Sequence, residues 1–166
     1  MKQTLIRTQY IVKALAFFLL CHTALLSQGK HIKKEKVPKN VLSSFEKQFP
    51  QATAKEYCKS KENKKTIYEI EFSDSNRTRE ARFDKQGEFI EVTEGMAMND
   101  VPDAVTKSVM NQHPKGQIKE VEKVTRGDVV EYRVTVHKGK EKKHLILDKL
   151  GNLFKRKHND KDSTKK

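Results

Sequence analysis

The chain aligns with itself, without a gap, at an offset of 64 residues. Residues 37–91 and 101–155 are identical at 13 of 55 positions, and apolar character is kept at many of the others. Chance rarely aligns two prolines, a glycine and an apolar pattern at one offset. A repeat of this length predicts two copies of one small structural unit. The identical pairs include Pro38 and Pro102, Pro50 and Pro114, Tyr68 and Tyr132, and Gly87 and Gly151.

Each copy opens with a short predicted helix. A proline suits the first turn of a helix, where a missing N–H costs nothing, and a second proline ends the helix. Between these prolines, residues at every fourth position form one stripe along the helix. The stripe consists of Val41, Phe45 and Phe49 in the first copy and of Val105, Val109 and His113 in the second. We interpret His113 as a helix-end residue at the edge of the core rather than a metal ligand, because no second ligand is spaced to join it.

Four extended segments follow each predicted helix, at residues 52–60, 66–73, 77–84 and 88–92, and again at 117–125, 130–136, 142–148 and 152–156. Apolar and polar residues alternate along them, so that Tyr68 and Ile70 share one face and Glu69 lies on the other. This alternation predicts strands with one face on the helix and one charged, polar face. The irregular alternation of the first segment in each copy indicates a β-bulge.

The predicted fold class is therefore α+β, as a tandem duplication of a helix followed by a four-stranded antiparallel sheet. A unit of about 55 residues is only marginally stable alone, so we expect the two copies to pack together or to pair their sheet edges. The chain divides into a signal peptide (1–29), a basic linker (30–36), a first repeat (37–92), a linker (93–100), a second repeat (101–156) and a basic disordered tail (157–166).

The first 29 residues have the parts of a secretory signal peptide. Three basic residues accompany the apolar run 14–20, and Ser27-Gln28-Gly29 offers a cleavage site with small residues. The alternative is a retained membrane anchor, but a span needs about 20 apolar residues and this run is shorter. Lipidation of Cys21 is disfavoured because Leu20 is not small. We therefore predict an exported protein, periplasmic or secreted after cleavage.

The protein is strongly basic. Removing residues 1–29 lowers the formal net charge from +13 to +10, because that segment holds three basic residues and no acidic one. Lysines concentrate in residues 30–36 and 155–166, which favours acidic partners or anionic surfaces. Nucleic acid is not expected as a partner of an exported protein. Cys58 is the one cysteine left after cleavage, so an internal disulfide cannot form.

Enzyme motifs are absent from the sequence. It has no Gly-rich phosphate loop and no HExxH, GxSxG or CxxC motif. Glu69 and Glu71 could mimic a catalytic carboxylate pair, but Arg133 stands at the matched position of the second copy, and a solvated sheet face is far more common. We predict a non-enzyme without a cofactor or a metal site.

Three motifs together resemble a known family: Val37-Pro38-x-x-Val41-x-x-x-Phe45-x-x-x-Phe49-Pro50, Tyr68-Glu69-Ile70-Glu71-Phe72 and Ala81-Arg82-Phe83-Asp84-x-x-Gly87. This pattern is similar to the PepSY-like family of exported bacterial proteins, described as beta-lactamase-inhibitor-like, over residues 37–155. The resemblance implies the helix-plus-sheet fold and the binding or inhibition of another protein, without naming a beta-lactamase as the target. Many members carry a Trp near Tyr57 or Val121, whereas this chain has no Trp.

We place the candidate binding surface on the polar sheet face, at Glu69, Glu71, Glu80, Arg82, Arg133, Thr135, His144 and Ile146. Two joined sheets would give a surface wide enough for a protein or peptide, and their edges could accept an added strand. The alternative is that this face is only solvated. A different class of function is an envelope-associated structural protein, held at anionic surfaces by the lysine-rich tails.

Overall fold

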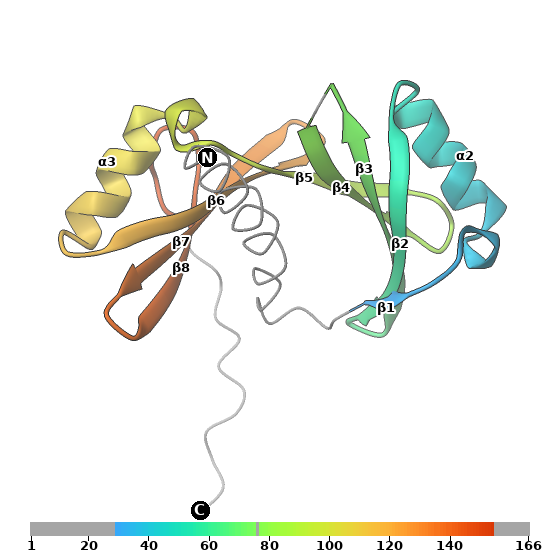
Figure 1. The fold of residues 1–166 in the computed structure, drawn as a ribbon, viewed down its shortest axis with the longest axis horizontal. Coiled ribbons are helices and arrows are strands. Elements are labelled where there is room, and N and C mark those ends of the chain that lie inside the picture. The colour runs from blue at the N-terminus through green and yellow to red at the C-terminus, as the bar shows by residue number, and fades with distance from the viewer. Residues whose placement is uncertain (1–28, 76, 155–166) are drawn as a thin grey trace, which may run out of the picture.

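A computed structural model describes residues 29–75 and 77–154 (Figure 1). The predicted signal peptide (except Gly29), the predicted tail at 157–166 and the last two residues of the strand predicted at 152–156 lie outside these residues. The elements are β1 (Lys30–His31), η1 (Lys34–Lys36), α2 (Lys39–Gln48), β2 (Thr53–Glu62), β3 (Lys65–Asp74), β4 (Arg77–Asp84), β5 (Phe89–Gly95), η2 (Met98–Asp100), α3 (Asp103–Gln112), β6 (Gln117–Arg126), β7 (Val129–Lys138) and β8 (Glu141–Leu147). Among the described helices, none has the length and apolarity needed to cross a membrane.

The repeat is visible in the element boundaries. The elements η2, α3, β6 and β7 each begin and end 64 residues after η1, α2, β2 and β3. The β-bulge predicted in the first strand of each copy is confirmed, between Ala54 and Glu56 in β2 and between Ile118 and Glu120 in β6. The matched prolines, Pro38 and Pro102, stand at the N-caps of the two helices.

All strands belong to one antiparallel sheet in the order β1 to β8. The halves are joined because β5 pairs with β4 on one side and with β6 on the other, over the register Val92↔Thr125 to Gly95↔Glu122. The predicted fold class, a tandem duplication of a helix followed by a four-stranded sheet, is therefore wrong: the described residues form one eight-stranded sheet with two short α-helices. The physical reason is that a strand has two rows of hydrogen-bonding groups, and β5 satisfies its second row by pairing with β6.

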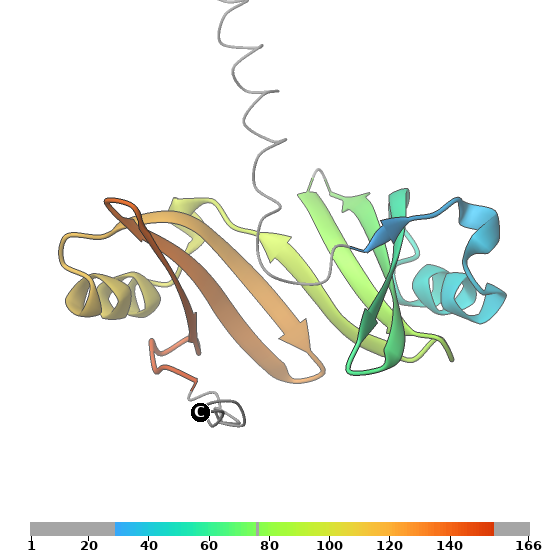
Figure 2. The same cartoon turned by 90° about the horizontal axis from the view of Figure 1, so that it is seen from below.

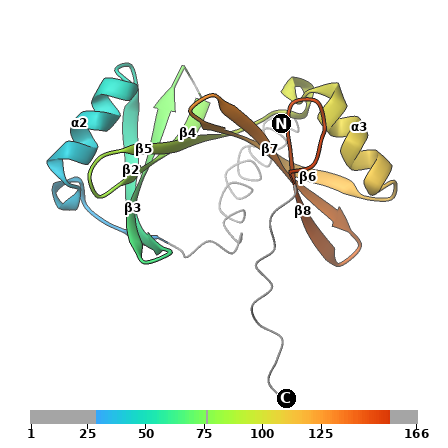
Figure 3. The ribbon, with the colours of Figure 1, turned by 180° about the vertical axis from the view of Figure 1, so that it is seen from behind.

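The strand count of each half also differs from four. Residues 30–31 form β1, which pairs with β2 at Cys58 and Lys59. The strand predicted at 152–156 is reduced, within the described residues, to an isolated bridge between Leu147 and Leu153. Each helix nevertheless packs on its own part of the sheet, and Figures 1 and 3 show α2 and α3 at its two outer ends.

Both helices cover the same face of the sheet. Val92 packs against the first core and is paired across the junction with Thr125, which is in turn paired with Val130 of the second core. Paired residues of neighbouring strands point to the same side, so the helix-covered face is continuous from one half to the other. The opposite face, here called the open face, has no described element packed on it and is seen from below in Figure 2.

The two cores have different compositions. In the first half Phe45 of α2 meets Phe72 of β3 at a ring-centroid distance of 5.3 Å, and Phe49 meets Phe72 at 4.7 Å. The second half is built mainly from valines, with Val105 and Val109 of α3 fully buried against the sheet. Val41 and Phe45 of the first stripe and Val105 and Val109 of the second are therefore buried in their cores, while His113 stands at the C-cap of α3. The interior predicted around Val41, Phe45, Tyr68 and Phe72 is confirmed.

The repeated Asp-Lys-x-Gly turns bring the sheet close to the helix. Asp84 Oδ1 accepts hydrogen bonds from the N–H groups of Gln86 and Glu88, and Asp148 accepts the equivalent pair. Gly87 and Gly151 follow with φ of +83° and +80°. A Cβ at these positions would lie 2.8 Å from the carbonyl oxygen of Asn40 in α2 and 2.4 Å from that of Ala104 in α3. The turns therefore require glycine for both backbone conformation and space.

Candidate functional site

The open face carries the eight predicted residues in two groups of four. Strands β3 and β4 place Glu69 opposite Arg82 and Glu71 opposite Glu80. Strands β7 and β8 place Arg133 opposite Ile146 and Thr135 opposite His144. Strands β5 and β6 lie between the two groups. The structure thus brings the members of each group together, while the centre of the face is made of residues that the sequence did not point to.

The most important of these central residues is Glu91 of β5. The residue is only 1% exposed although it lies on the open face. Arg82 Nη1 donates to Glu91 Oε1 at 2.9 Å, and Arg126 Nε donates to Glu91 Oε2 at 2.5 Å. Arg133 Nη2 approaches the same Oε2 at 3.6 Å. Arginines from β4, β6 and β7 therefore meet at one carboxylate, next to the β5–β6 junction.

Further carboxylates extend this arrangement on both sides. Arg82 also donates to Glu62 at the end of β2, and Arg126 Nη1 lies 2.7 Å from Glu131 Oε2 in β7. Burial alone would raise the pKa of Glu91, but the hydrogen bond from Arg82 and the charges of Arg133 and Arg126 lower it below its usual value. We call this set the arginine–glutamate network; it comprises Glu62, Arg82, Glu91, Arg126, Glu131 and Arg133.

A second feature of the open face is a group of carboxylates around Glu80. Burial and, after it, the neighbouring charge of Glu69 raise the pKa of Glu80 to about 7, against the opposing charge of Arg82. Glu71 lies directly across the strand pair and adds to the repulsion. Glu80 is therefore partly protonated near neutral pH, and a cation placed over this group would favour its charged form.

The second half offers a different surface. The Oγ1 of Thr135 lies 3.2 Å from Nδ1 of His144, and Ile146 is half-buried beside Arg133. Carboxylates thus dominate the part of the open face on β3 and β4, whereas cationic and neutral side chains dominate the part on β7 and β8. A partner that covers both parts must present complementary charge to each.

Cys58 lies on β2 beside Glu69, and its thiol is not activated. Its Sγ is 3.6 Å from His31 Nδ1. Burial and the nearby glutamates, Glu69 first, raise the pKa of Cys58 to about 11. Because the thiolate is the reactive form, this environment disfavours a nucleophilic role.

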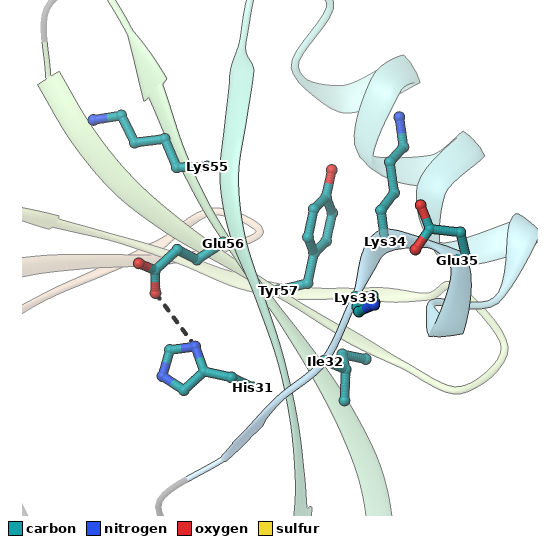
Figure 4. Close-up of a pocket in the computed structure, with 8 residues that line it drawn as sticks. All are labelled: His31, Ile32, Lys33, Lys34, Glu35, Lys55, Glu56 and Tyr57. Carbon is teal, nitrogen blue, oxygen red and sulfur yellow. Dashed lines mark ion pairs between the residues drawn. The ribbon is translucent and has the colours of Figure 1, made fainter.

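An open recess of about 520 Å³ lies at the opposite edge of the sheet from β8, between η1 and β2. Figure 4 shows its lining: His31 points toward Glu56, whose Oε2 is 3.4 Å from His31 Nδ1, while the Tyr57 ring extends along the wall between them and η1. Within residues 29–75 and 77–154, no group of three or more His, Cys, Asp and Glu side chains is placed to hold a metal ion. The recess therefore offers a surface for contact rather than a set of reactive groups.

Family comparison fits this architecture. The family model described as "Putative beta-lactamase-inhibitor-like, PepSY-like" matches the chain twice, over residues 24–90 and 67–155. The chain belongs to this family. The two PepSY-like matches end at residues 90 and 155, close to the 64-residue offset of the repeat. Tyr57 and Val121, the positions near which a Trp is expected in the PepSY-like family, both pack toward the helix-side cores rather than the open face.

Solved structures share the fold at low sequence identity. A BLIP-like protein from Bacteroides fragilis is 21% identical, with a TM-score of 0.59 over 77% of this chain and 91% of its own. A DUF2874 family protein from Bacteroides uniformis is 20% identical, with a TM-score of 0.61 over 71% and 86%. One of the "putative periplasmic proteins" from Bacteroides eggerthii is 18% identical, with a TM-score of 0.61 over 72% and 86%. No curated protein matches the chain.

Proposed function

We propose that this PepSY-like protein is an exported, non-catalytic binding module whose open face binds another envelope or secreted protein. The observation that carries the proposal is the placement of both helices on one face of a continuous sheet, which leaves a broad charged face without a described element on it. The family description as inhibitor-like and the periplasmic description of the Bacteroides eggerthii structure support binding and export.

The structure suggests which side chains to change in a test. Arg82 belongs to the arginine–glutamate network. Reversing its charge would leave the carboxylates of Glu62 and Glu91 without this ion-pair partner and would destabilise the fold. Glu71 lies on the same face outside that network. The variant Glu71→Lys changes the charge of the open face, and Glu46→Lys on the exposed side of α2 makes the same chemical change on the other side of the molecule.

The experiment is affinity capture from the envelope extract of the source organism, followed by titration of the purified captured protein. We expect Glu71→Lys to weaken the complex at least tenfold, because it places a cation where the partner meets carboxylates. Glu46→Lys should bind as the unmodified protein does. Equal affinities of the two variants, or a larger loss in Glu46→Lys, would remove the open face as the binding surface.

A second candidate function is attachment to anionic envelope surfaces through lysines. The observation that favours it is the cluster of exposed lysines beside the recess, at Lys33, Lys34 and Lys55 (Figure 4). Sedimentation with anionic and with neutral vesicles tests it, with Lys33→Gln and Lys34→Gln combined. Attachment of this kind weakens steeply with salt, whereas salt-insensitive sedimentation would contradict it.

A further inference from the structure

The edge strand β1 is the counterpart of the end of β5. At the 64-residue offset, the two residue pairs that join β1 to β2 match two of the pairs that join β5 to β6. Just after β1, Ile32 N donates to Tyr57 O at 2.9 Å. The matched hydrogen bond, from Met96 N to Val121 O, measures 2.8 Å. Because β5 extends further upstream whereas β1 begins at Lys30, β1 is a shortened β5 at the outer edge of the sheet (Figure 1).

The charges that face these two strands are inverted between the halves. In the second half, Arg126 and Arg133 meet the carboxylate that Glu91 of β5 supplies. At the 64-residue offset, Glu62 and Glu69 stand in place of these two arginines. The complement of two carboxylates is a cation, and the match between the strands places it at the upstream end of β1.

Gly29, the residue before β1, lies against one of these carboxylates. A Cβ at Gly29 would be 2.9 Å from Oε2 of Glu69 and 3.1 Å from Cβ of Cys58. The other carboxylate oxygen of Glu69, Oε1, accepts a hydrogen bond from Ser60 at 2.7 Å and lies 3.9 Å from Arg82 Nε. Oε2 is therefore the oxygen that is turned toward the backbone at the start of β1.

The backbone nitrogen of Lys30 follows directly. Because hydrogen-bonded and non-hydrogen-bonded pairs alternate along antiparallel strands, the bond donated by Ile32 N implies that the nitrogen of Lys30 also faces β2, at the carbonyl of Lys59. The sequence predicts removal of the signal peptide after Gly29, which would make this nitrogen an α-ammonium group. Such a group has one N–H for the carbonyl of Lys59 and two more that can turn to the open face.

We propose that the α-ammonium group of Lys30, freed when the signal peptide is removed, binds the carboxylate of Glu69 and becomes part of the open face. A signal peptidase adds one water across the Gly29–Lys30 peptide bond. The new carboxylate leaves with Gly29 and the signal peptide, while the new ammonium stays on Lys30. The inference rests on the export proposed above, but it requires no partner protein.

The first measurement is the intact mass of the protein purified from the envelope of its source organism. We expect a chain that begins at Lys30, and any other first residue would overturn the proposal.

The second measurement compares two recombinant proteins released from a cleavable fusion, one that begins at Lys30 and one with two glycines before Lys30. The glycines move the ammonium group by up to about 7 Å. Only the neutral amine reacts with sulfo-N-hydroxysuccinimide acetate, and a nearby carboxylate favours the charged form. We expect N-terminal acetylation at pH 7, followed by mass spectrometry, to be at least threefold slower in the protein that begins at Lys30. Equal rates would overturn the proposal.

Variants assign the effect to Glu69. In the protein that begins at Lys30, Glu69→Gln should restore the faster rate, whereas Glu46→Gln on the exposed side of α2 should not. Thermal unfolding adds a readout that does not depend on amine reactivity. The protein that begins at Lys30 should unfold about 3 °C higher than the one with two glycines, and this difference should disappear in Glu69→Gln. A slow rate or a thermal difference that persists in Glu69→Gln would overturn the proposal.

These measurements fail separately from the binding test with Glu71→Lys. Equal affinities in that test would remove the open face as the binding surface and leave the ion pair of Lys30 in place. Equal acetylation rates would remove the ion pair and leave the binding surface in place.

Discussion

The two halves share a backbone plan but differ in how they are filled. The first half has an aromatic core in which Phe45, Phe49 and Phe72 contact one another, and its β4 is flanked by the acidic β5. The second half has a core mainly of valine, and beside its β8 lie a bridge from Leu153 to Leu147 and a hydrogen bond from Phe154 N to Ile146 O. The prolines at the helix ends and the Asp-Lys-x-Gly turns are kept at the 64-residue offset because they supply backbone conformations that few other residues can supply. Part of each core is kept as well, at Val41/Val105 and Tyr68/Tyr132, whereas the aromatic residues Phe45 and Phe72 are matched by Val109 and Val136.

The largest expected difference between the halves concerns the cores. Phe72→Ala removes a fully buried ring that touches two others and should lower the free energy of unfolding by about 4 kcal/mol. Val136→Ala, at the matched position of β7, should cost about 2 kcal/mol because less apolar volume is lost. Urea unfolding of both variants measures this. Equal losses would mean that the aromatic core gives the first half no extra stability.

The next effect concerns the junction between the halves. Glu91→Gln leaves three arginines facing a neutral amide, and breaking a buried ion pair in this way costs about 3 kcal/mol. Glu131→Gln removes a partly exposed carboxylate from the same network and should cost less than about 1 kcal/mol. Differential scanning calorimetry gives both values. A Glu91→Gln protein as stable as its parent would show that the network does not hold the halves together.

A smaller effect, which depends on pH, is expected at Glu80, whose matched position in the second half holds His144. The folded-state pKa of Glu80 is raised to about 7 from an ordinary value of 4.5, so the folded state holds this proton more tightly than the unfolded state. The wild-type protein therefore loses stability as pH rises between these values. Glu80→Gln should be more stable than wild type at pH 8 by about 2 kcal/mol, with little difference at pH 4. Chemical unfolding at the two pH values measures the difference; Glu46→Gln controls for loss of one carboxylate, and a constant difference would contradict the assignment.

The smallest effect is expected at the rim of β4. Arg77 is 62% exposed and lies 3.9 Å from Glu94, so Arg77→Ala should change the free energy of unfolding by less than about 0.5 kcal/mol. Arg79→Ala, whose guanidinium is less exposed and contacts both Asp74 and Glu94, should cost more. Thermal unfolding of both variants measures this. A larger loss of stability in Arg77→Ala than in Arg79→Ala would show that burial does not determine how much these ion pairs contribute.

The sequence predicted the elements better than their assembly. Helices and most strands were visible because local periodicity marks them: Val41 and Phe45 follow a helical period, and Tyr68 and Ile70 follow that of a strand. Pairing of the sheet edges was one of two expected ways of joining the copies, but the pattern did not identify β5 and β6 as the paired strands, because this pairing depends on two edges that meet only after folding. The prediction of four strands in each half was wrong for the same reason. The pairing of β1, and of the residues near Leu153, is not marked by any local sequence pattern.

The eight predicted residues of the candidate site followed from alternation, whereas the central Glu91 was hidden by one irregularity in the register. The eight predicted residues lie on the strands expected and pair within each half as expected from the offset. Glu91 was missed because the register shifts between Arg82 and Phe83, so that Phe89 and Val92 both face the core and simple alternation fails. A carboxylate between two apolar residues of a short strand was the signal that could have revealed it.

The short register between β5 and β6 has a mechanical consequence. Four residue pairs join the halves, from Val92↔Thr125 to Gly95↔Glu122, whereas nine join β2 to β3 and nine join β6 to β7. Twisting of the molecule should therefore concentrate at the β5–β6 pairing. The ion pairs of Glu91 with Arg126 and Arg133 cross this pairing and should limit the twist. The affinity of a ligand that contacts both halves would therefore depend on the angle between them. A change in this angle would alter the distance between the open-face residues on β3 and β4 and those on β7 and β8 without unfolding either half.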